Sequence, residues 1–531
     1  MKQFFRQRSQ IVALLLLLAS CGVYCIAFSS QVDRNPLRGD EVDFFQCMHN
    51  VTALGKPLFY AGELELPDNV VLPLSIELLS GQEFHFFRFK PETGIFKETF
   101  FAVANEDSRY NYCLWHPPLY VYLGALSLRL LDLTIAQSAL LRYTHLIYAL
   151  GMLIGMSFLA RELYQHAWLP GLALAALFLA TNSLAVRSGL LIDYNGALAQ
   201  CVAVWLTWAL LRVDRQPRAM PLAMVLFALT FATGLGVGAS IALGLLVWAL
   251  IFRRQHARIC QLVTIPGGIL LFVAAFWAFA RLVRLPFSQP FLHNFQRAEL
   301  QTSLVERLTA MVRFTGWYAE EIGLVMVVLG ILLGINRLRH RQADRLLLPI
   351  LVLVAVLSMA GLSGDAYGFP KYIAFALPLL FVFAGGELVL LAREPRWRAA
   401  AVAAVLVLVM AQTWQSVEIL ARPGGTLYNR GEQGFAQAAS AVAANSRPDD
   451  TLLTSKDLAF YANRRFVRWE WSGALLTDPS ALQRRLQSEH ITAVAASLGQ
   501  FGAASPEVNA WLAGHATLIF ADGDFQLLKL H

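Results

Sequence analysis

Long apolar segments constrain the fold of this 531-residue chain more than any other feature. A helix needs about 17–25 mostly apolar residues to cross a bilayer. Hydrophobic residues make up 57% of the chain and charged residues only 15%, whereas charged residues are about a quarter of an average soluble domain. This composition excludes a set of soluble domains, a disordered or fibrous chain and a disulfide-rich secreted protein. We therefore predict a polytopic α-helical membrane protein.

The segment 219–252 is apolar throughout and too long for a single span. Arginines flank both of its ends, so both ends are expected on the same side of the membrane. We place a hairpin tip at the glycine-rich run 234–238. With this division the chain has about 11 expected spans. They are residues 11–28, 143–160, 167–186, 196–211, 219–233, 239–252, 259–280, 317–335, 346–362, 372–391 and 398–414.

Arginine clusters decide the orientation of these spans. Four of these clusters lie on the same side of the membrane as the basic N-terminus only if the apolar segment 117–131 does not cross the membrane. They are at 212–218, 253–258, 337–345 and 393–398. The positive-inside rule places that side in the cytoplasm. We therefore expect 117–131 to be re-entrant or to lie on the outer surface. The N-terminus is predicted to be cytoplasmic and the C-terminus extracytoplasmic, in a plasma membrane such as the bacterial inner membrane.

This topology predicts two domains. Residues 1–414 form the membrane domain, with a long first outer loop at 29–142 and a second outer loop at 281–316. Residues 415–531 form a small extracytoplasmic α/β domain. Its expected elements are a helical pattern and three strand-like runs. These lie at 433–445, 451–454, 491–497 and 516–520.

The net charge of +7 is unevenly distributed, which argues against nucleic acid as a partner. Residues 29–116 hold 7 basic and 13 acidic side chains. Among the acidic ones, Asp40, Glu41 and Asp43 follow the first span closely. A carboxylate at this boundary can act as a general base or a metal ligand. The alternative is that these acids are simply solvated.

Asp193 is a sharper candidate, because it lies among apolar residues at the end of a span. Charged groups at such depth are costly and usually face an interior cavity. In the predicted topology Asp193 emerges on the same face as Asp40. Two acids converging on one face favour a functional site there.

Basic residues on the outer face depart from the positive-inside rule and therefore need a reason. Binding a lipid phosphate is one reason, and a headgroup contact without catalysis is the alternative. His116, in Trp-His-Pro-Pro, is a phosphate or metal contact or an interfacial aromatic. Cys47 and Cys113 share the first loop, as a disulfide or as two free thiols. The other outer candidates are Arg281, Arg284, His293, Asn294, Arg297, Lys371 and Tyr372.

The order of these motifs resembles the GT-C membrane glycosyltransferases, particularly the protein-mannosyltransferase and aminoarabinose-transferase branch (glycosyltransferase family 39-like). Asp-Glu opens the long outer loop, and His-Pro-Pro-Leu-Tyr closes it. An Arg-Tyr-led span, a short Leu-Ile-Asp loop and an outer Lys-Tyr before a proline-containing span follow. The similarity covers roughly residues 10–415 and does not include the C-terminal segment.

The resemblance implies inverting transfer of a sugar from a polyprenyl-phosphate carrier to a lipid, glycan or protein hydroxyl on the outer face. It implies that Asp40 is the base, that Glu41 helps to position it and that Asp193 is the second family aspartate. His116 matches the His-Pro-Pro element, and 281–316 matches the loop over the sugar donor's phosphate. Positive charge for the departing phosphate is expected from basic residues, and a divalent metal ion could assist. These residues are His293, Arg297 and Lys371, with Tyr372 beside the last.

Two other functions stay open at this stage. A transporter or lipid flippase would also need many spans, but it predicts internal repeats and ionisable groups near mid-membrane, and we find neither in the sequence. A scaffold for polysaccharide assembly would bind its partner through the outer C-terminal domain.

Overall fold

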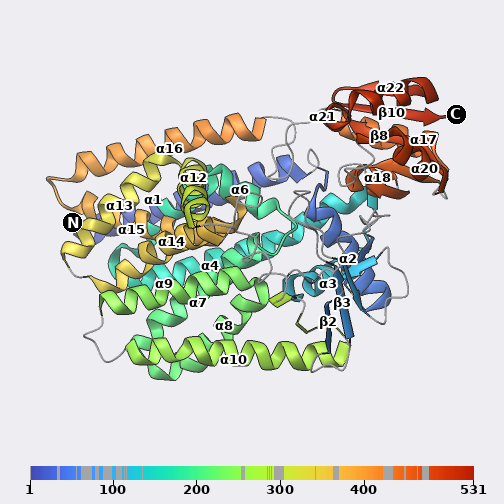
Figure 1. The fold of residues 1–531 in the computed structure, drawn as a ribbon. Helices are drawn as coiled ribbons and strands as arrows, with labels where there is room; N and C mark the ends of the chain where they lie inside the picture. Colours follow the sequence, from blue (N-terminus) through green and yellow to red (C-terminus); the bar gives the residue numbers. More distant parts are fainter. Residues whose placement is uncertain are drawn as a thin grey trace.

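Long helices run side by side through most of the molecule, and shorter elements gather at one end with the C-terminal unit (Figure 1). The computed structural model describes the larger part of the chain. The described residues are 2–32, 36–55, 57–60, 74–77, 83–87, 99–102, 110–112, 114, 116–133, 135–252, 258–283, 285, 287–288, 290–291, 304–340, 342–362, 370–421, 434–447, 450–462, 464–468, 477–488 and 490–531.

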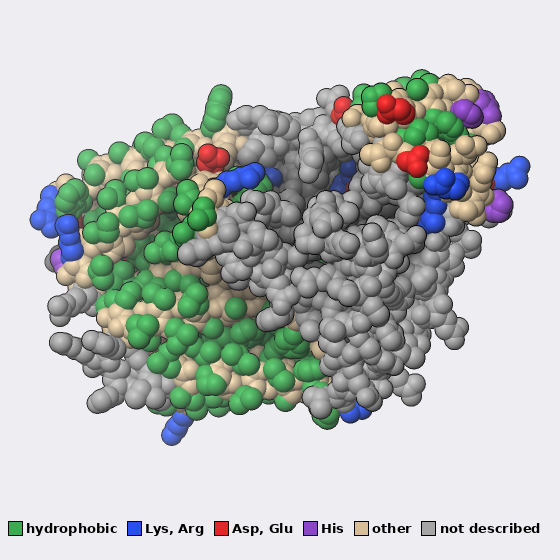
Figure 2. All heavy atoms as spheres, viewed as in Figure 1, with side chains coloured by type: hydrophobic (Ala, Val, Ile, Leu, Met, Phe, Trp, Pro, Cys, Tyr) green, Lys and Arg blue, Asp and Glu red, His purple; other side chains and the backbone are tan. Residues whose placement is uncertain are grey.

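The long helices make this chain a multi-pass membrane protein. Within the described residues, 6 helical stretches are long and apolar enough to cross a membrane, or 7 if one bent pair counts as a span. Hydrophobic side chains cover much of the visible outer face of these helices (Figure 2), as lipid contact requires. The helices of this bundle are α1 (Lys2–Val32), α4 (His145–Tyr164), α5 (Trp168–Thr181), α6 (Ser183–Leu190), α7 (Ala197–Arg215), α8 (Met220–Thr233), α9 (Leu235–Ile251), α10 (Arg258–Val283), α12 (Leu304–Ile322), α13 (Leu324–Arg339), α14 (Ala343–Leu362), α15 (Leu377–Arg393) and α16 (Arg398–Ala421).

The predicted division of 219–252 into two helices is confirmed. The break is shorter than the glycine-rich run suggested, because only Gly234 separates α8 from α9. Gly234 has an extended backbone (φ −170°), and helix α9 continues through the other two glycines of the run. The number of spans across the whole chain stays a prediction.

Two segments that were each expected to form one straight span are divided into two helices. The segment 167–186 is divided at Asn182, whose side chain accepts a hydrogen bond from the backbone N–H of Ala185 and starts a new helix. The segment 317–335 is divided at Gly323, where α12 and α13 bend by 100°. Gly323 has φ +95°, a conformation that side-chain-bearing residues rarely adopt. Both breaks lie beside polar residues, Thr181 and Ser183 at the first and Glu320 and Glu321 at the second, which the assignment of single spans did not take into account.

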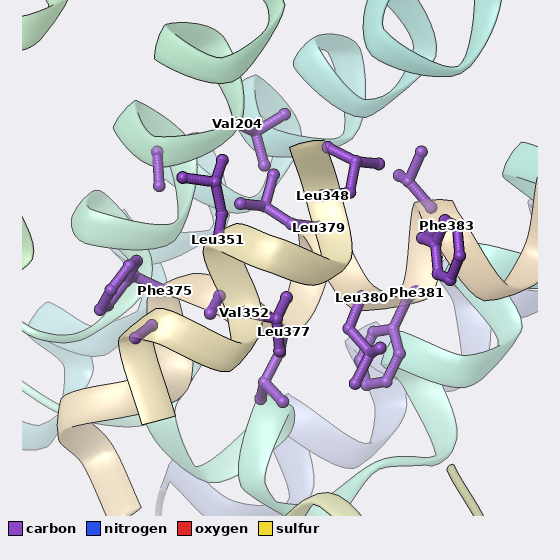
Figure 3. Close-up of a cluster of buried hydrophobic side chains, with 14 of the residues drawn as sticks. Val204, Leu348, Leu351, Val352, Phe375, Leu377, Leu379, Leu380, Phe381 and Phe383 are labelled. Atoms are coloured by element: carbon purple, nitrogen blue, oxygen red, sulfur yellow. The ribbon is translucent and has the colours of Figure 1, made fainter. Parts of the chain in front are cut away.

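Helix α15 is the centre of the bundle and is buried on all sides over residues 377–388. Its side chains interlock with those of α14 and α7, as Leu351, Leu379 and Val204 illustrate (Figure 3). The 3-10 helix η5 (Pro370–Ala376) leads directly into α15. The most buried helix therefore continues into the segment that carries Lys371.

Short elements form a layer around the end of the bundle near α2 (Asp40–Leu54). Val42 and Phe45 of α2 pack with Tyr120 and Val121 of α3 in one apolar cluster. Helix α3 is thus packed against α2, while its expected non-crossing placement stays a prediction. The other elements of this layer are β1 (Leu58–Tyr60), β2 (Leu74–Glu77), β3 (Glu83–Phe87), β4 (Thr99–Ala102), β5 (Tyr110–Tyr112), α3 (Leu119–Leu131) and η2 (Ile135–Thr144). Two further 3-10 helices, η3 (Gln165–Ala167) and η4 (Pro217–Ala219), connect α4 to α5 and α7 to α8.

The C-terminal unit is α/β, as predicted. Its five-stranded sheet has the order β7-β6-β8-β10-β9. Strand β6 is parallel to β7 and β8, whereas β10 is antiparallel to β8 and β9. The expected helix and three strands are present, together with two strands that the pattern did not reveal. The elements are α17 (Phe435–Asn445), β6 (Thr451–Thr454), α18 (Lys456–Ala462), β7 (Arg465–Arg468), α20 (Pro479–Ser488), β8 (Ile491–Ser497), α21 (Leu498–Ala503), α22 (Pro506–His515), β9 (Ala516–Asp522) and β10 (Phe525–Leu530).

Close contact between α5 and α15 requires small residues. A Cβ on Gly385 would lie 2.5 Å from the carbonyl oxygen of Gly171. We expect Gly385→Ala to force the helices apart and to lower the free energy of unfolding by about 1–3 kcal/mol. Gly22→Ala in α1 is the control, because no atom lies within 4 Å of its Cβ position. Thermal unfolding in detergent checks this, and equal midpoints for the two variants would contradict it.

Candidate active site

Three segments far apart in the sequence meet at the ammonium group of Lys371. Lys371 Nζ lies 2.6 Å from Asp193 Oδ2 and 3.1 Å from Asp40 Oδ2. Lys371 comes from η5, Asp193 from the turn between α6 and α7, and Asp40 from the first residue of α2. Asp40 and Asp193, which the predicted topology placed on the same face, therefore lie at one site.

The two carboxylates differ in their exposure to solvent. The side chains of Asp193 and Lys371 are buried, at 0% and 1% exposure, whereas that of Asp40 is 48% exposed. A second molecule can therefore reach the carboxylate of Asp40 without any rearrangement of the buried pair. The buried carboxylate of Asp193 has no such access.

A tight turn holds Asp193 in place. Its Oδ1 accepts hydrogen bonds from the backbone N–H of Asn195 at 3.0 Å and from Asn195 Nδ2 at 3.3 Å. A Cβ on Gly196 would lie 2.8 Å from the carbonyl oxygen of Leu191, so the turn closes only with glycine there. Oδ1 is thus used by the turn, and Oδ2 points to Lys371.

Burial raises the pKa of the Asp193 carboxyl above its usual value, since desolvation disfavours the charged form. The neighbouring Lys371 ammonium opposes this increase, and the Asp40 carboxylate adds to it. The ionised form of Asp193 therefore depends on its contact with Lys371.

Glu41 lies directly behind Asp40 in a fully buried ion pair. Arg142 Nη2 donates to both Glu41 carboxylate oxygens, at 2.9 and 3.0 Å, and both side chains have 0% exposure. Glu41 Oε1 also accepts the backbone N–H of Ile192 at 3.0 Å. Through Glu41, the N-terminus of α2 is thus attached to the turn that carries Asp193.

His116 lies beside the same turn. Its ring is 3.5 Å, centre to centre, from the ring of Tyr194, the residue that follows Asp193. Phe44 contacts both Tyr194 and Tyr120 at ring distances of 6.2 and 5.8 Å. The Tyr120 hydroxyl is 3.0 Å from His145 Nε2. The His-Pro-Pro element therefore supports the site through aromatic contacts.

The other predicted site residues fall into two groups. The Tyr372 ring lies 5.3 Å from Lys371 Nζ, beside the site. Arg281 is exposed at the end of α10, with its guanidinium 5.6 Å from the ring of Trp277. The remaining candidates lie outside the described residues, and so does the second cysteine of the first loop. These are Arg284, His293, Asn294, Arg297 and Cys113.

Sequence reasoning assigned no role to three residues at this site. Arg142 neutralises Glu41, and Lys456 and Asp457 of α18 bind Asp43 and Arg38. A signal for Arg142 was available, because an arginine at the outer end of a span departs from the positive-inside rule. No comparable signal marks the α18 residues, which look like ordinary surface charges.

The candidate site offers two carboxylates with an ammonium between them. Within the described part of the chain, no group of three or more His, Cys, Asp or Glu side chains could hold a metal ion. Lys371 takes the position between the acids that a cation would need. This donor set does not fit the divalent metal ion considered as a possible assistant, so we derive no step through a metal ion.

Solved structures show which fold this is. The chain is similar to ArnT from Cupriavidus metallidurans in the apo state, with 14% identity, a TM-score of 0.59 and 98% of each chain covered. The same protein bound to undecaprenyl phosphate gives 14% identity, a TM-score of 0.55 and 97% coverage of each chain. ArnT is a GT-C glycosyltransferase. The chain has the GT-C fold.

The expected GT-C fold is thereby confirmed, and the likeness includes the C-terminal unit that the motifs did not cover. No protein-family profile matches the sequence, and no curated protein is similar to it. At this level of identity the GT-C likeness concerns the fold alone.

The buried Glu41–Arg142 pair gives a stability prediction. Arg142→Met leaves the Glu41 carboxylate buried without its counter-ion, which we expect to cost about 3–5 kcal/mol. Adding Glu41→Gln removes the orphaned charge and should restore part of the loss. Unfolding in detergent measures both.

Arg396→Met is the control for this pair. It breaks the Arg396–Glu394 pair, whose side chains are 78% and 50% exposed, and should change the stability by less than about 1 kcal/mol. Additive losses in the Arg142 and Glu41 double variant would contradict the assignment of the pair.

Proposed function

We propose that this protein is a membrane glycosyltransferase that moves a sugar from a polyprenyl-phosphate carrier to a hydroxyl acceptor on the extracytoplasmic face. The observation that carries the proposal is a half-exposed carboxylate, Asp40, held by a buried lysine and backed by a second, fully buried aspartate. The GT-C fold and the undecaprenyl phosphate bound to one ArnT structure support it.

Asp40 acts as the general base. Its carboxylate takes the proton of the acceptor hydroxyl while the hydroxyl oxygen attacks the anomeric carbon of the sugar. The bond from this carbon to the phosphate oxygen breaks, and polyprenyl phosphate leaves with the electron pair. Attack opposite to the leaving group inverts the configuration. The phosphate needs no protonating acid, which agrees with one exposed carboxylate instead of two.

Lys371 supplies positive charge near the departing phosphate. Its ammonium contacts Asp40 at 3.1 Å and Asp193 at 2.6 Å, so the contact with exposed Asp40 is the longer one. We infer that the sugar donor's phosphate competes with Asp40 for Lys371, while Asp193 keeps the ammonium in place. Loss of the lysine contact makes Asp40 a stronger base, because a neighbouring cation lowers carboxylate basicity.

The remaining residues have supporting roles in this proposal. Glu41 positions Asp40 through its contacts with Arg142 and Ile192. His116 and Tyr372 lie beside the site, His116 against the Tyr194 ring and Tyr372 beside Lys371. His293 and Arg297 are proposed as phosphate contacts from the sequence alone.

Replacement of Asp40 tests the catalytic role. Asp40→Asn removes the base, and we expect transfer to fall by roughly 10²–10⁴-fold. Binding of undecaprenyl phosphate should persist, because the Lys371–Asp193 pair is unchanged. The measurement is transfer from a polyprenyl-phosphate sugar by the purified protein, with binding of undecaprenyl phosphate measured separately.

Asp132→Asn is the matched control. Asp132 is an exposed residue that ends α3, and its left-handed backbone (φ 49°) suits asparagine equally well. Its activity should equal that of the wild type. Unchanged transfer in Asp40→Asn would refute the assigned base.

A deletion strain would identify the product. We expect mass spectrometry of lipids and envelope glycans to show the loss of one sugar from an outer-face glycoconjugate. If all glycans are intact and the purified protein moves lipid across liposome membranes, a flippase replaces the glycosyltransferase as the better assignment.

A further inference from the structure

The C-terminal unit contacts the segment that immediately precedes Asp40. The Asp457 carboxylate in the first turn of α18 accepts the backbone N–H of Gly39, at 3.1 and 3.2 Å from its two oxygens. It also accepts Arg38 Nε at 2.8 Å. The preceding residue, Lys456, forms an ion pair with Asp43 in the first turn of α2.

Gly39 is the residue whose conformation sets the direction of α2. It has φ +59° and ψ −127°, and α2 has no side-chain cap at this end. Asp40 is the first helical residue after it, so a rotation at Gly39 would move the Asp40 side chain directly. The bonds from Asp457 fix both Gly39 and the adjacent Arg38.

A second residue of α18 holds the same segment. The backbone N–H of Leu37 donates to the Tyr461 hydroxyl at 2.6 Å. Burial raises the pKa of Tyr461, so the hydroxyl keeps its proton and can donate in turn. Ser138 Oγ, 3.5 Å away, lies within reach of it. Two backbone N–H groups just before Asp40, those of Leu37 and Gly39, thus donate hydrogen bonds to side chains of α18.

Apolar contacts accompany these polar ones. The Arg38 guanidinium lies 4.1 Å above the ring of Phe435 in α17. Phe460 of α18 meets Phe45 of α2 edge to face at 5.7 Å and belongs to the apolar cluster of α2 and α3. The C-terminal unit is therefore packed onto α2 over several residues, and its contact is more than a single ion pair.

We propose that Asp457 and Tyr461 are positioning residues, through which the C-terminal unit holds the start of α2 so that Asp40 faces Lys371. The proposal rests on the proposed function in so far as Asp40 is the base. The C-terminal unit is then part of the catalytic apparatus and not a separate binding module. Small displacements of a reacting group cost large factors in rate, so the effect is expected mainly in kcat.

The test compares full-length variants by transfer kinetics and by hydrogen exchange of peptides covering residues 37–43. In Asp457→Ala we expect faster exchange in these peptides and a decrease in kcat of roughly ten- to a hundredfold. The KM for the sugar donor should stay unchanged. Asp457→Asn keeps an oxygen that can accept from Gly39 and should recover part of kcat. Tyr461→Phe keeps the ring, removes the hydroxyl that accepts from Leu37 and lies within reach of Ser138, and should accelerate exchange.

Asp450→Ala is the matched control. The Asp450 carboxylate accepts the backbone N–H of Arg447 within the C-terminal unit, away from α2. This variant should leave kcat and the exchange of residues 37–43 as in the wild type.

The outcomes separate this proposal from the proposed function. Unchanged exchange in both Asp457→Ala and Tyr461→Phe would overturn the positioning role. Faster exchange with unchanged kcat would also overturn it, because the contact would then only attach the unit. If the wild type transfers no sugar, the proposed function fails, whereas the exchange measurement still decides whether α18 fixes the start of α2.

Discussion

The ammonium group of Lys371 is the charge on which this site depends. Transfer of an unpaired ammonium from water into a protein interior costs several kcal/mol, so a side chain with 1% exposure must have counter-ions. Asp193 and Asp40 supply them from positions 178 and 331 residues away in the sequence. The ammonium group of Lys371 in η5 is neutralised only when two other segments lie beside it. These segments are the start of α2 and the turn after α6. Because η5 continues into the central helix α15, the meeting point is fixed relative to the whole bundle.

A second buried pair makes the arrangement rigid. Glu41 and Arg142 are fully buried, and Glu41 also binds the backbone beside Asp193. The two successive acids at the start of α2 therefore have different tasks. Glu41 attaches the helix to the protein, and Asp40 presents a carboxylate to solvent. In its proposed role as a base, Asp40 needs both access and a fixed direction, and the division of tasks between the adjacent residues provides the two together.

Hydropathy and charge distribution predicted those features of the molecule that depend only on whether a segment prefers lipid or water. The apolar runs correspond to helices, and the break near Gly234 follows from arginines at both ends of one long run. Asp40, Asp193 and Lys371 were expected on one face because each lies at the end of a span. The bend at Gly323 was not predicted, since a glycine that follows two glutamates does not by itself reveal a positive φ.

Contacts between residues far apart in the sequence were the other feature that could not be predicted. Asp457 and Arg38 are 419 residues apart, and nothing in either local pattern indicates their pairing. The same reasoning explains how a GT-C fold persists at 14% identity to ArnT. Many different apolar sequences can form a membrane helix bundle, whereas only the few buried charged residues need particular partners. The charges of the candidate site lie near α2, where the fold leaves substrate choice open, whereas the buried Glu387 of α15 pairs with Arg337 of α13. Changes in specificity within such a fold are therefore expected in the short elements around α2 and in the C-terminal unit that holds them, more than in the long helices.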